Sequence, residues 1–447
     1  MPNVIDFLSY PLPIEIKTAI IEGDYSRAKK IINNYMTLNI PQELILRLKY
    51  ELERMTQIKR NYPYGEKEAS IILRKGLKNY RKEEFRSWLE NGYIDRIRYD
   101  NRYLYFSRFF QNLLFLNPAL SERKKIINKK MERAKALLNE RITKINSGEL
   151  LKYRITAGIR VKLEKTKKYR VWLPIPLENG IIENVKILKI EPENNIISKE
   201  SAQNTIYFEA KNNNFYVEFQ YQIKETSLGS KNTYDDSKQS FRISEMLKEK
   251  YPHVVFSPYL RKLTENIVSE EKNNYRKAKR IYDWITENVR YTYVPDYFLF
   301  DNISEYVATS LRGDCGMQAL LFITMCRIAG IPAKWQSGWY TTPYNVTPHD
   351  WAQIYIEPYG WIPVDPSKGG INNNKNNFYK REFYFGNMDG FRMIANEDFQ
   401  VDFDPSKKFM RSDPVDNQIG EVETDSENIF PDKFKHKIYI RKFERLH

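Results

Sequence analysis

The sequence has only two cysteines and four histidines among its 447 residues. Two thiols cannot form the disulfide framework of a small secreted protein. Cys315 and Cys326 are eleven positions apart, which on one helix separates them by about 16 Å, too far for a bond. The sequence also lacks an apolar run long enough to cross a membrane, and its first residues lack the pattern of a secretory signal. These absences predict a soluble protein of a reducing cytoplasm, with no membrane span.

Positive charge is concentrated in the N-terminal third of the chain. The whole sequence carries a formal charge of +15, and residues 1–150 hold 29 Lys and Arg against 18 Asp and Glu. Such a region could attract polyanions. No RNA-recognition, zinc-finger or phosphate-loop pattern accompanies the charge, so no specific nucleic acid is expected. A solvated lysine-rich surface is the simplest interpretation, and an acidic protein partner is the functional alternative.

Residues 1–150 predict a helical domain, because apolar residues recur three or four positions apart in successive segments. Those segments are IEIKTAIIEG, YSRAKKIINNYM, PQELILRLKYELERM, KEASIILRKGL, KEEFRSWLENG and ERKKIINKKMERAKALLNERI. Short breaks such as Gly23-Asp24 and Asn91-Gly92 separate the helices. Stacked helical-hairpin repeats are an alternative arrangement, although the segments show no firm repeat period.

After Tyr153 the apolar residues alternate with period two, which predicts a small antiparallel β-sandwich domain over residues 151–228. The polar stretch 225–239 is typical of a linker. Helical and strand patterns then mix over residues 240–405, and residues 406–447 form a C-terminal extension. The sequence therefore predicts a multidomain α+β protein.

One cysteine lies where a loop turns into a helix, in RGDCGMQALLFITMCRIAGIP. Asp314 is typical of a helix N-cap, and Gly330 with Pro332 marks the helix end, so Cys315 falls in the first turn. The helix dipole favours a thiolate there but contributes only about 0.3–1 kcal/mol, less than one pKa unit. A reactive thiol at this place therefore needs a base. Cys326 is expected to be a small buried hydrophobe.

The histidine that follows the cysteine helix is His349, in HDWAQIYIEPYGWIPVD. The alternation before residue 357 and the strand-like residues after 360 predict an antiparallel hairpin. In that register His349 faces Asp365, and directly opposed side chains have Cβ atoms about 4.5–5.5 Å apart. If the Cys315 helix packs against the same face, the three residues form a nucleophile, base and orienter. Asp350 should point to the opposite face, and no metal site is predicted.

These motifs resemble the transglutaminase-like superfamily of papain-type cysteine enzymes. The likeness runs through KAKRIYDWITENVRYTY, RGDCGMQALLFITMCRIAGIPAKWQSGWY, HDWAQIYIEPYGWIPVDPS and YFGNMDGFRM, over about 240–405. It implies a transglutaminase-like α+β core in which Cys315 is the nucleophile, His349 the general base and acid, and Asp365 the residue that orients His349. It also implies an oxyanion site made by the Cys315 backbone N–H and an upstream side chain, for which Tyr293 and Tyr291 are candidates.

The resemblance implies acyl transfer without a cofactor or metal. The first hypothesis is a cysteine hydrolase of peptide, isopeptide or side-chain amide bonds in a protein or peptide substrate, through a thioester acyl-enzyme. One alternative is a transglutaminase-type acyltransferase that crosslinks proteins through lysine amines. Another is a non-catalytic or slow scaffold that binds a partner through the basic helical region. Zinc-containing peptide N-glycanases of the superfamily are excluded, because two cysteines cannot form paired CxxC motifs.

Overall fold

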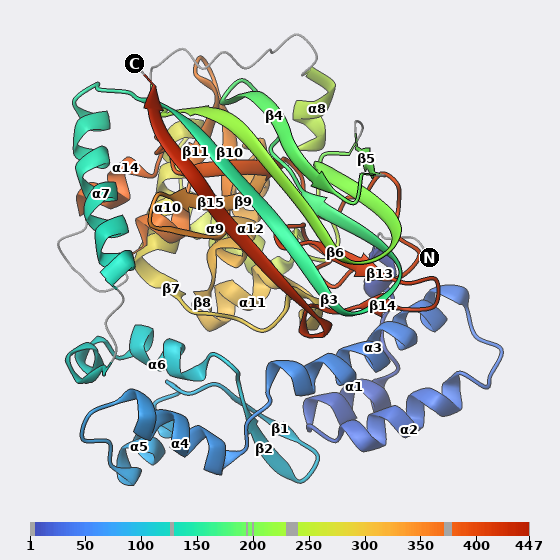
Figure 1. The fold of residues 1–447 in the computed structure, drawn as a ribbon. Coiled ribbons are helices and arrows are strands. Elements are labelled where there is room, and N and C mark those ends of the chain that lie inside the picture. Colours follow the sequence, from blue (N-terminus) through green and yellow to red (C-terminus); the bar gives the residue numbers. More distant parts are fainter. Residues whose placement is uncertain are drawn as a thin grey trace.

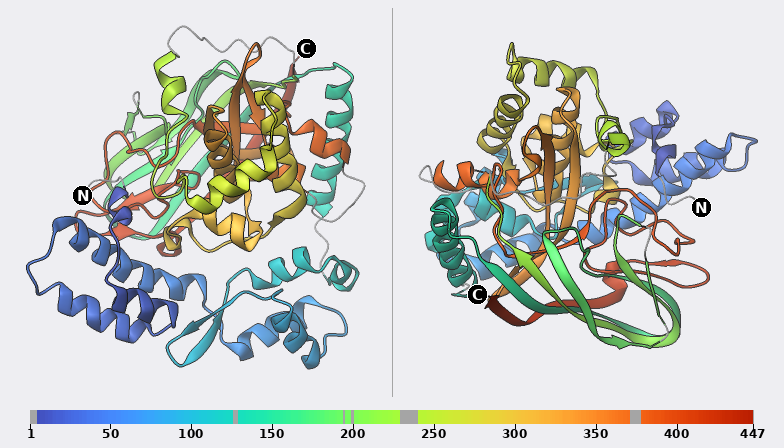
Figure 2. Two further views of the ribbon diagram at one scale, coloured as in Figure 1. Left: turned by 180° about the vertical axis from the view of Figure 1, so that it is seen from behind. Right: turned by 90° about the horizontal axis from the view of Figure 1, so that it is seen from above.

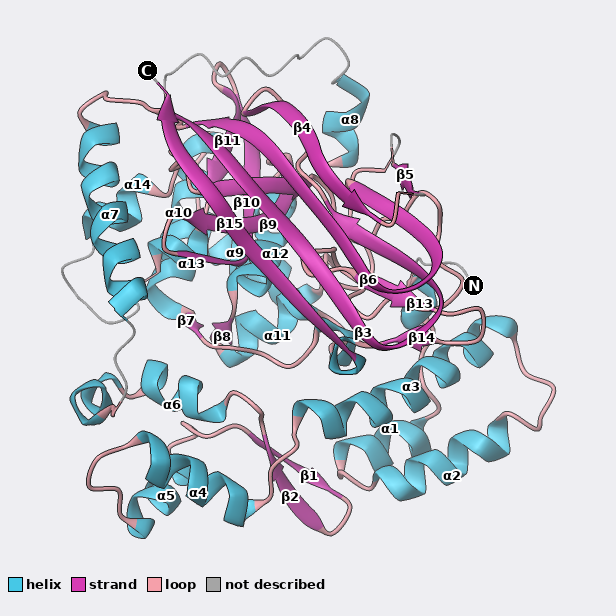
Figure 3. Ribbon diagram, in the orientation of Figure 1, coloured by secondary structure: helices cyan, strands magenta, loops and turns pink. Residues whose placement is uncertain are grey.

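The computed structural model describes the chain at residues 5–125, 129–193, 195–198, 201–228, 240–370 and 378–446. The α+β class predicted from the sequence is confirmed, because helical layers and antiparallel sheets occupy separate parts of the molecule (Figures 1 and 3). The linker predicted at 225–239 lies outside the described residues from position 229 onward. Within the described ranges, no helix combines the length and the apolar character needed to cross a membrane.

The N-terminal region forms a layer of helices that lies below the rest of the molecule in Figure 1. Its helices are α1 (Ile14–Ile21), α2 (Tyr25–Tyr35), α3 (Gln42–Asn61), α4 (Glu66–Gly76), α5 (Lys82–Glu90) and α6 (Phe109–Leu116). Helix α7 (Lys129–Asn146) stands beside the large sheet instead, with Leu138 and Ile142 in that sheet's core. The sequence did not predict α6 or the hairpin β1 (Arg96–Tyr99) and β2 (Arg102–Tyr105). Asp100, with φ of 52°, closes this hairpin in a two-residue turn.

Two long strands, β3 (Lys152–Pro174) and β6 (Thr205–Lys224), form the centre of a curved antiparallel sheet (Figure 2). The register between them shifts after Lys162. Strands β4 (Ile182–Glu191) and β5 (Asn195–Ile197) pair with β6. The segment predicted as a C-terminal extension supplies β13 (Glu421–Glu423), β14 (Asn428–Ile429) and β15 (Phe434–Leu446). Because β13 and β15 pair with β3, residues 151–228 and 406–447 share one sheet.

A second antiparallel sheet has the strand order β11-β10-β9-β12. Its strands are β9 (Ala333–Thr342), β10 (Asn345–Ile356), β11 (Gly360–Val364) and β12 (Arg392–Asn396), and the helices on one face are α9 (Pro258–Val268), α10 (Asn274–Asn288), α11 (Ile303–Ser310) and α12 (Cys315–Ile328). Ala352 and Ile354 share the core of these helices, whereas Trp351 shares the core of the curved sheet. The second sheet therefore packs against α12 on one face and against the curved sheet on the other. Shorter elements are α8 (Ser240–Glu245), β7 (Arg290–Tyr291), η4 (Tyr297–Leu299), β8 (Arg312–Gly313), α13 (Pro366–Gly369) and α14 (Phe378–Phe383).

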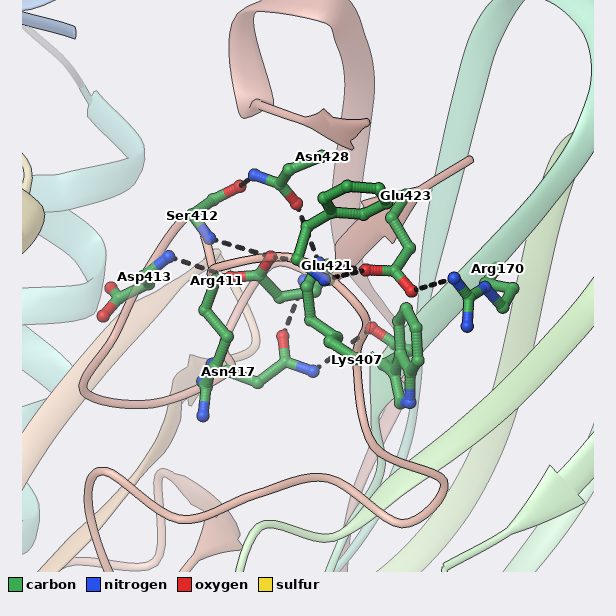
Figure 4. A network of polar contacts seen from close by, with 12 residues as sticks. Arg170, Lys407, Arg411, Ser412, Asp413, Asn417, Glu421, Glu423 and Asn428 are labelled. Atoms are coloured by element: carbon green, nitrogen blue, oxygen red, sulfur yellow. Dashed lines mark hydrogen bonds and ion pairs between the residues drawn. The ribbon is translucent and has the colours of Figure 1, made fainter. Parts of the chain in front are cut away.

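A buried polar network anchors the C-terminal segment 404–424 to the curved sheet (Figure 4). The ammonium of Lys407 is fully buried and lies 3.1 Å from Glu421 Oε2. Arg170, on β3, pairs with Glu423 at 2.7 Å. Glu421 also accepts two backbone N–H groups of the same segment. These contacts fix the loop that continues toward the helix α12.

Replacing Lys407 with Ala should strongly destabilise the fold, because Glu421 would stay buried without its nearest cation. Breaking a buried ion pair in this way costs about 3–5 kcal/mol of unfolding free energy. Urea denaturation measures the loss. The control is Lys435→Ala, an exposed lysine on β15, for which a change within about 0.5 kcal/mol is expected. Equal stabilities of the two variants would contradict this account of the network.

Candidate active site

Cys315 is the first residue of α12, and its neighbour Asp314 caps that helix. Asp314 Oδ1 accepts the Met317 backbone N–H at 3.1 Å and the Tyr297 hydroxyl at 2.6 Å. Both cysteines are free thiols, but Cys315 is partly exposed whereas Cys326 is fully buried. Cys315 is therefore the more accessible of the two cysteine residues.

His349 on β10 lies beside Asp365, the residue that follows β11. The imidazole Nε2 and the carboxylate Oδ2 are 2.7 Å apart. The ladder pairs Ala352 with Val364, so Trp351 rather than His349 falls opposite Asp365. His349 lies two residues farther along the same face and reaches the carboxylate diagonally. The expectation that His349 lies directly opposite Asp365 is thus wrong by two positions along β10. The predicted contact between the two side chains nevertheless forms.

Asp365 is held from several sides, which fixes the imidazole in turn. Its Oδ2 also lies 2.8 Å from Nη2 of Arg392, and its Oδ1 accepts the Lys368 backbone N–H at 3.0 Å. Burial raises the pKa of Asp365, but His349 and Arg392 lower it by more, so the carboxyl stays ionised. Burial also lowers the pKa of His349, against the opposing effect of Asp365. A neutral imidazole beside a carboxylate can accept a proton.

His349 and α12 lie on opposite faces of β10. The His349 ring stacks on Trp351 with centroids 5.7 Å apart, in the core of the curved sheet. Helix α12 packs instead on the face that carries Ile354, where a Cβ added at its Gly316 would lie 2.8 Å from Asp350 Oδ2. The expectation that the cysteine helix covers the His349 face is therefore wrong. The expectation that Asp350 points away from the His349 face agrees with the structure.

The Cys315 sulfur lies at the edge of the sheet, beside Asp350. Its Sγ donates to Asp350 Oδ2 at 3.2 Å, and the Asp350 backbone N–H also bonds to the sulfur. The backbone N–H of Tyr355 donates to the carbonyl of Pro332, just before β9. Backbone N–H groups alternate in direction along a strand, so those of even-numbered β10 residues point toward β11 instead. In the described part of the chain, β11 ends opposite Ala352. The amide of Asp350 therefore has no partner in that strand and is open to the sulfur.

In the described part of the chain, the Cys315 sulfur and the His349 imidazole are not hydrogen-bonded to each other. Among the described residues, the thiol donates to Asp350, and the assigned bond of the His349 ring goes to Asp365. Because Nε2 is engaged by Asp365, Nδ1 is the ring nitrogen left to take a proton from Cys315. The structure brings His349 and Asp365 together and places Cys315 against the next residue along β10.

The surroundings of Cys315 favour a neutral thiol. Burial, and then the carboxyls of Asp350 and Asp314, raise the pKa of Cys315. Burial raises the pKa of Asp314 to about 6, and it also raises that of Asp416, from the C-terminal segment, to about 6. These effects outweigh the helix N-terminus. In the described residues, no group of three acidic, histidine or cysteine side chains is arranged to hold a metal ion.

The two tyrosines considered for the oxyanion site have different surroundings. Tyr291, which pairs with Gly313 in β8, is close enough for the charge of Cys315 to raise its pKa, after the larger effect of burial. Tyr293 exchanges two backbone hydrogen bonds with the side chain of Asn112 in the N-terminal helices. Tyr291 is therefore close to the sulfur, and the two bonds of Tyr293 are made by its backbone rather than by its hydroxyl.

The N-terminal helices hold the loop at residues 293–301, which carries Tyr293 and Tyr297. Tyr50 of α3 stacks on Phe298 and donates to its carbonyl at 3.0 Å. Asn61, at the end of α3, bonds to both the backbone N–H and the carboxylate of Asp296. The helical region thus supports residues 293–301, from which Tyr297 bonds to the cap of α12.

Gly316 permits the close packing around the thiol. A Cβ at this position would collide with the Tyr297 hydroxyl and lie 2.8 Å from Asp350 Oδ2. We expect Gly316→Ala to lower the free energy of unfolding by about 1–3 kcal/mol, as overpacking does. Chemical denaturation measures this against Gly370→Ala, where a Cβ would meet its nearest atom at 3.4 Å. A Gly316→Ala variant as stable as that control would refute the packing described here.

Comparison with known proteins identifies the region that contains these residues. Residues 261–366 match the model of the transglutaminase-like superfamily. The uncharacterized protein YebA of Bacillus subtilis (strain 168) is 24% identical over 132 residues, which cover 25% of this chain and 18% of YebA. The match therefore spans less than a fifth of that relative's length.

Two solved structures show low similarity over larger parts of the chain. A candidate cysteine protease from Cytophaga hutchinsonii is 15% identical with a TM-score of 0.39, covering 67% of this chain and 90% of that chain. The periplasmic domain of TgpA from Pseudomonas aeruginosa is 12% identical with a TM-score of 0.29, covering 47% and 87%. The family resemblance expected from the sequence is confirmed by the match at residues 261–366.

Proposed function

Because residues 261–366 form a transglutaminase-like domain, we propose that this protein is a cysteine-dependent hydrolase of peptide, isopeptide or side-chain amide bonds. The observation that supports this most is the buried hydrogen-bonded pair of His349 and Asp365. The residue after His349 in β10, Asp350, accepts a hydrogen bond from the Cys315 thiol. An imidazole oriented by a carboxylate beside a thiol at a helix N-terminus is an arrangement for nucleophilic acyl transfer. The substrate is a protein or peptide.

The first half of the reaction forms an acyl-enzyme. The Cys315 thiol gives its proton to His349 Nδ1, while Asp365 holds Nε2 and stabilises the imidazolium. The thiolate attacks the carbonyl carbon of the amide. The developing oxyanion is bound by the Cys315 backbone N–H and by the Tyr291 hydroxyl. His349 then gives the proton to the departing nitrogen, the C–N bond breaks, and a thioester on Cys315 remains.

The second half releases the acyl group. A water molecule attacks the thioester carbonyl while His349 takes its proton, and the C–S bond breaks to give a carboxylic acid and the free thiol. If a lysine amine replaces water, the same steps give a new amide and crosslink two proteins. Hydrolysis and transfer therefore differ only in which nucleophile reaches the thioester.

Trapping the acyl-enzyme tests the proposal. The purified protein is incubated with glutamine peptides, amidated peptides and isopeptide-linked peptides, quenched in acid, and examined by intact mass spectrometry. We expect a mass increase on Cys315 that hydroxylamine removes and that Cys315→Ala lacks. Ammonia release from glutamine peptides without added amine indicates hydrolysis, whereas release that requires an amine indicates transfer. Absence of both adduct and turnover with every peptide class would contradict the enzyme and favour a scaffold.

A further inference from the structure

Asp350 contacts the Cys315 sulfur through both its side chain and its backbone. Oδ2 accepts the S–H bond at 3.2 Å, and the backbone N–H also bonds to Sγ. The other carboxyl oxygen, Oδ1, accepts a hydrogen bond from the Gln418 side-chain amide, whose Nε2 also donates to the His349 carbonyl at 3.1 Å. Asp350 is only 4% exposed, so these bonds are shielded from water.

Gln418 belongs to the C-terminal segment 404–424, outside the matched family region, and that segment is itself fixed. The indole N–H of Trp339 donates to the Gln418 carbonyl at 2.7 Å. Asn417 donates to the carbonyl of Trp172 at 3.1 Å. The Lys407 network anchors the rest of the segment (Figure 4). These contacts therefore hold the Gln418 side chain beside Asp350.

We propose that Asp350 is a resting-state partner that holds the Cys315 thiol neutral and away from His349, and that Gln418 is the positioning residue that keeps Asp350 there. The inference rests on the proposed function, because it concerns the ionisation of the same nucleophile. For the reaction, the sulfur has to leave Asp350 Oδ2 and give its proton to His349 Nδ1. The Asp350 contact therefore competes with activation of the thiol.

The charges around this contact are mostly acidic. Burial, and then the carboxyls of Asp416 and Asp314, raise the pKa of Asp350. Once Asp350 is ionised, the thiol has to lose its proton beside an existing negative charge, which is unfavourable. Removing the carboxyl should therefore lower the pKa of Cys315. The titratable groups that interact with the pair are Asp314 at α12, Tyr291 on β7, Tyr297 in η4, and Asp413 and Asp416 in the C-terminal segment. Arg411 interacts with Asp413 and Asp416, and His349 lies on the other face of β10.

The test is the pH dependence of Cys315 alkylation by iodoacetamide, followed by intact mass spectrometry in a Cys326→Ala background. Asp350→Asn should move the midpoint down by at least about one pH unit, which makes alkylation about tenfold faster below both midpoints. Gln418→Leu should move it in the same direction by less. Asp425→Asn, which removes an exposed carboxylate of the following turn, should leave the midpoint unchanged.

An unchanged or higher midpoint in Asp350→Asn would overturn the inference. Should that variant not fold, Gln418→Leu decides in the same way: a lower midpoint supports the inference and an unchanged or higher one overturns it. Failure of the proposed function is seen separately. If the wild-type protein forms a thioester but the alkylation midpoint does not shift in the variants, only the proposed resting-state contact is contradicted. If the midpoint shifts but no thioester forms, only the proposed enzyme activity is contradicted.

Discussion

Replacing His349 with Ala should lower kcat/KM by at least about 10⁴-fold while leaving the protein folded. Loss of the base from a nucleophile–base–orienter unit removes nearly all the catalysis that the unit provides, and the residual rate comes from binding and the oxyanion site. The ring of His349 is 5% exposed and sits among aromatic side chains, so a moderate loss of stability is also expected. Steady-state kinetics on the peptide identified by acyl-enzyme trapping measures the effect.

His253 provides the matched control for this variant. Its ring is fully buried, and its Nδ1 accepts the Ile303 backbone N–H at 3.4 Å. Burial lowers the pKa of His253 to about 3, so the ring is neutral at physiological pH. His253→Ala should therefore reduce stability but keep the turnover of each folded molecule within a few-fold of wild type. Equal losses of turnover in the two variants would show that His349 is a structural histidine.

Replacing Asp365 with Ala should reduce both activity and stability. The variant leaves Arg392, which is 1% exposed, with a buried charge that has lost its 2.8 Å partner, and such a change costs about 3–5 kcal/mol. Because the pKa of Asp365 is lowered by folding, its contribution to stability is complete above the unfolded pKa of about 3.9 and is lost as the pH falls through the folded pKa. Urea denaturation at pH 7 measures the loss of stability in the variant, and denaturation of the wild type in acid measures the loss with falling pH.

Asp365→Asn separates the two roles of the carboxylate. The amide can still accept a bond from Arg392 or His349, so the loss of stability should be smaller than in Asp365→Ala. Activity should nevertheless fall by about 10³–10⁴-fold, because the amide no longer holds the required tautomer or stabilises the imidazolium. Activity of Asp365→Asn within tenfold of wild type would mean that Asp365 only supports the fold.

Local sequence patterns predicted the parts of the site that depend on neighbouring residues. The cap at Asp314, the start of α12 at Cys315 and the hairpin that carries His349 all follow from spacing and turn chemistry. The hairpin register is two residues away from a direct His349–Asp365 pairing, because the turn comprises residues 357–359 and places Ile356 opposite Gly360. The diagonal contact with Asp365 needs the packing of α13 and Arg392, which no local pattern contains.

The contacts missed by the sequence analysis all join distant segments. Gln418 reaches His349 and Asp350 from about 70 residues away, and a loop of the C-terminal segment has no periodicity that points to a partner. The contact of Asp350 with the sulfur depends on which face of β10 the helix α12 covers. Both faces of that strand are apolar, since Trp351 and Ile354 are each fully buried, so alternation did not identify the helix-covered face.

The central claim is that the Cys315 sulfur, the His349 imidazole and the Asp365 carboxylate act as one unit. The most direct measurement is a crystal structure of the protein after Cys315 has reacted with a chloromethyl ketone of a substrate peptide. We expect the sulfur to have left Asp350 and His349 Nδ1 to lie within about 3–4 Å of it, with Nε2 still bonded to Asp365. A sulfur that reacts while the imidazole remains beyond reach in the core would contradict the mechanism.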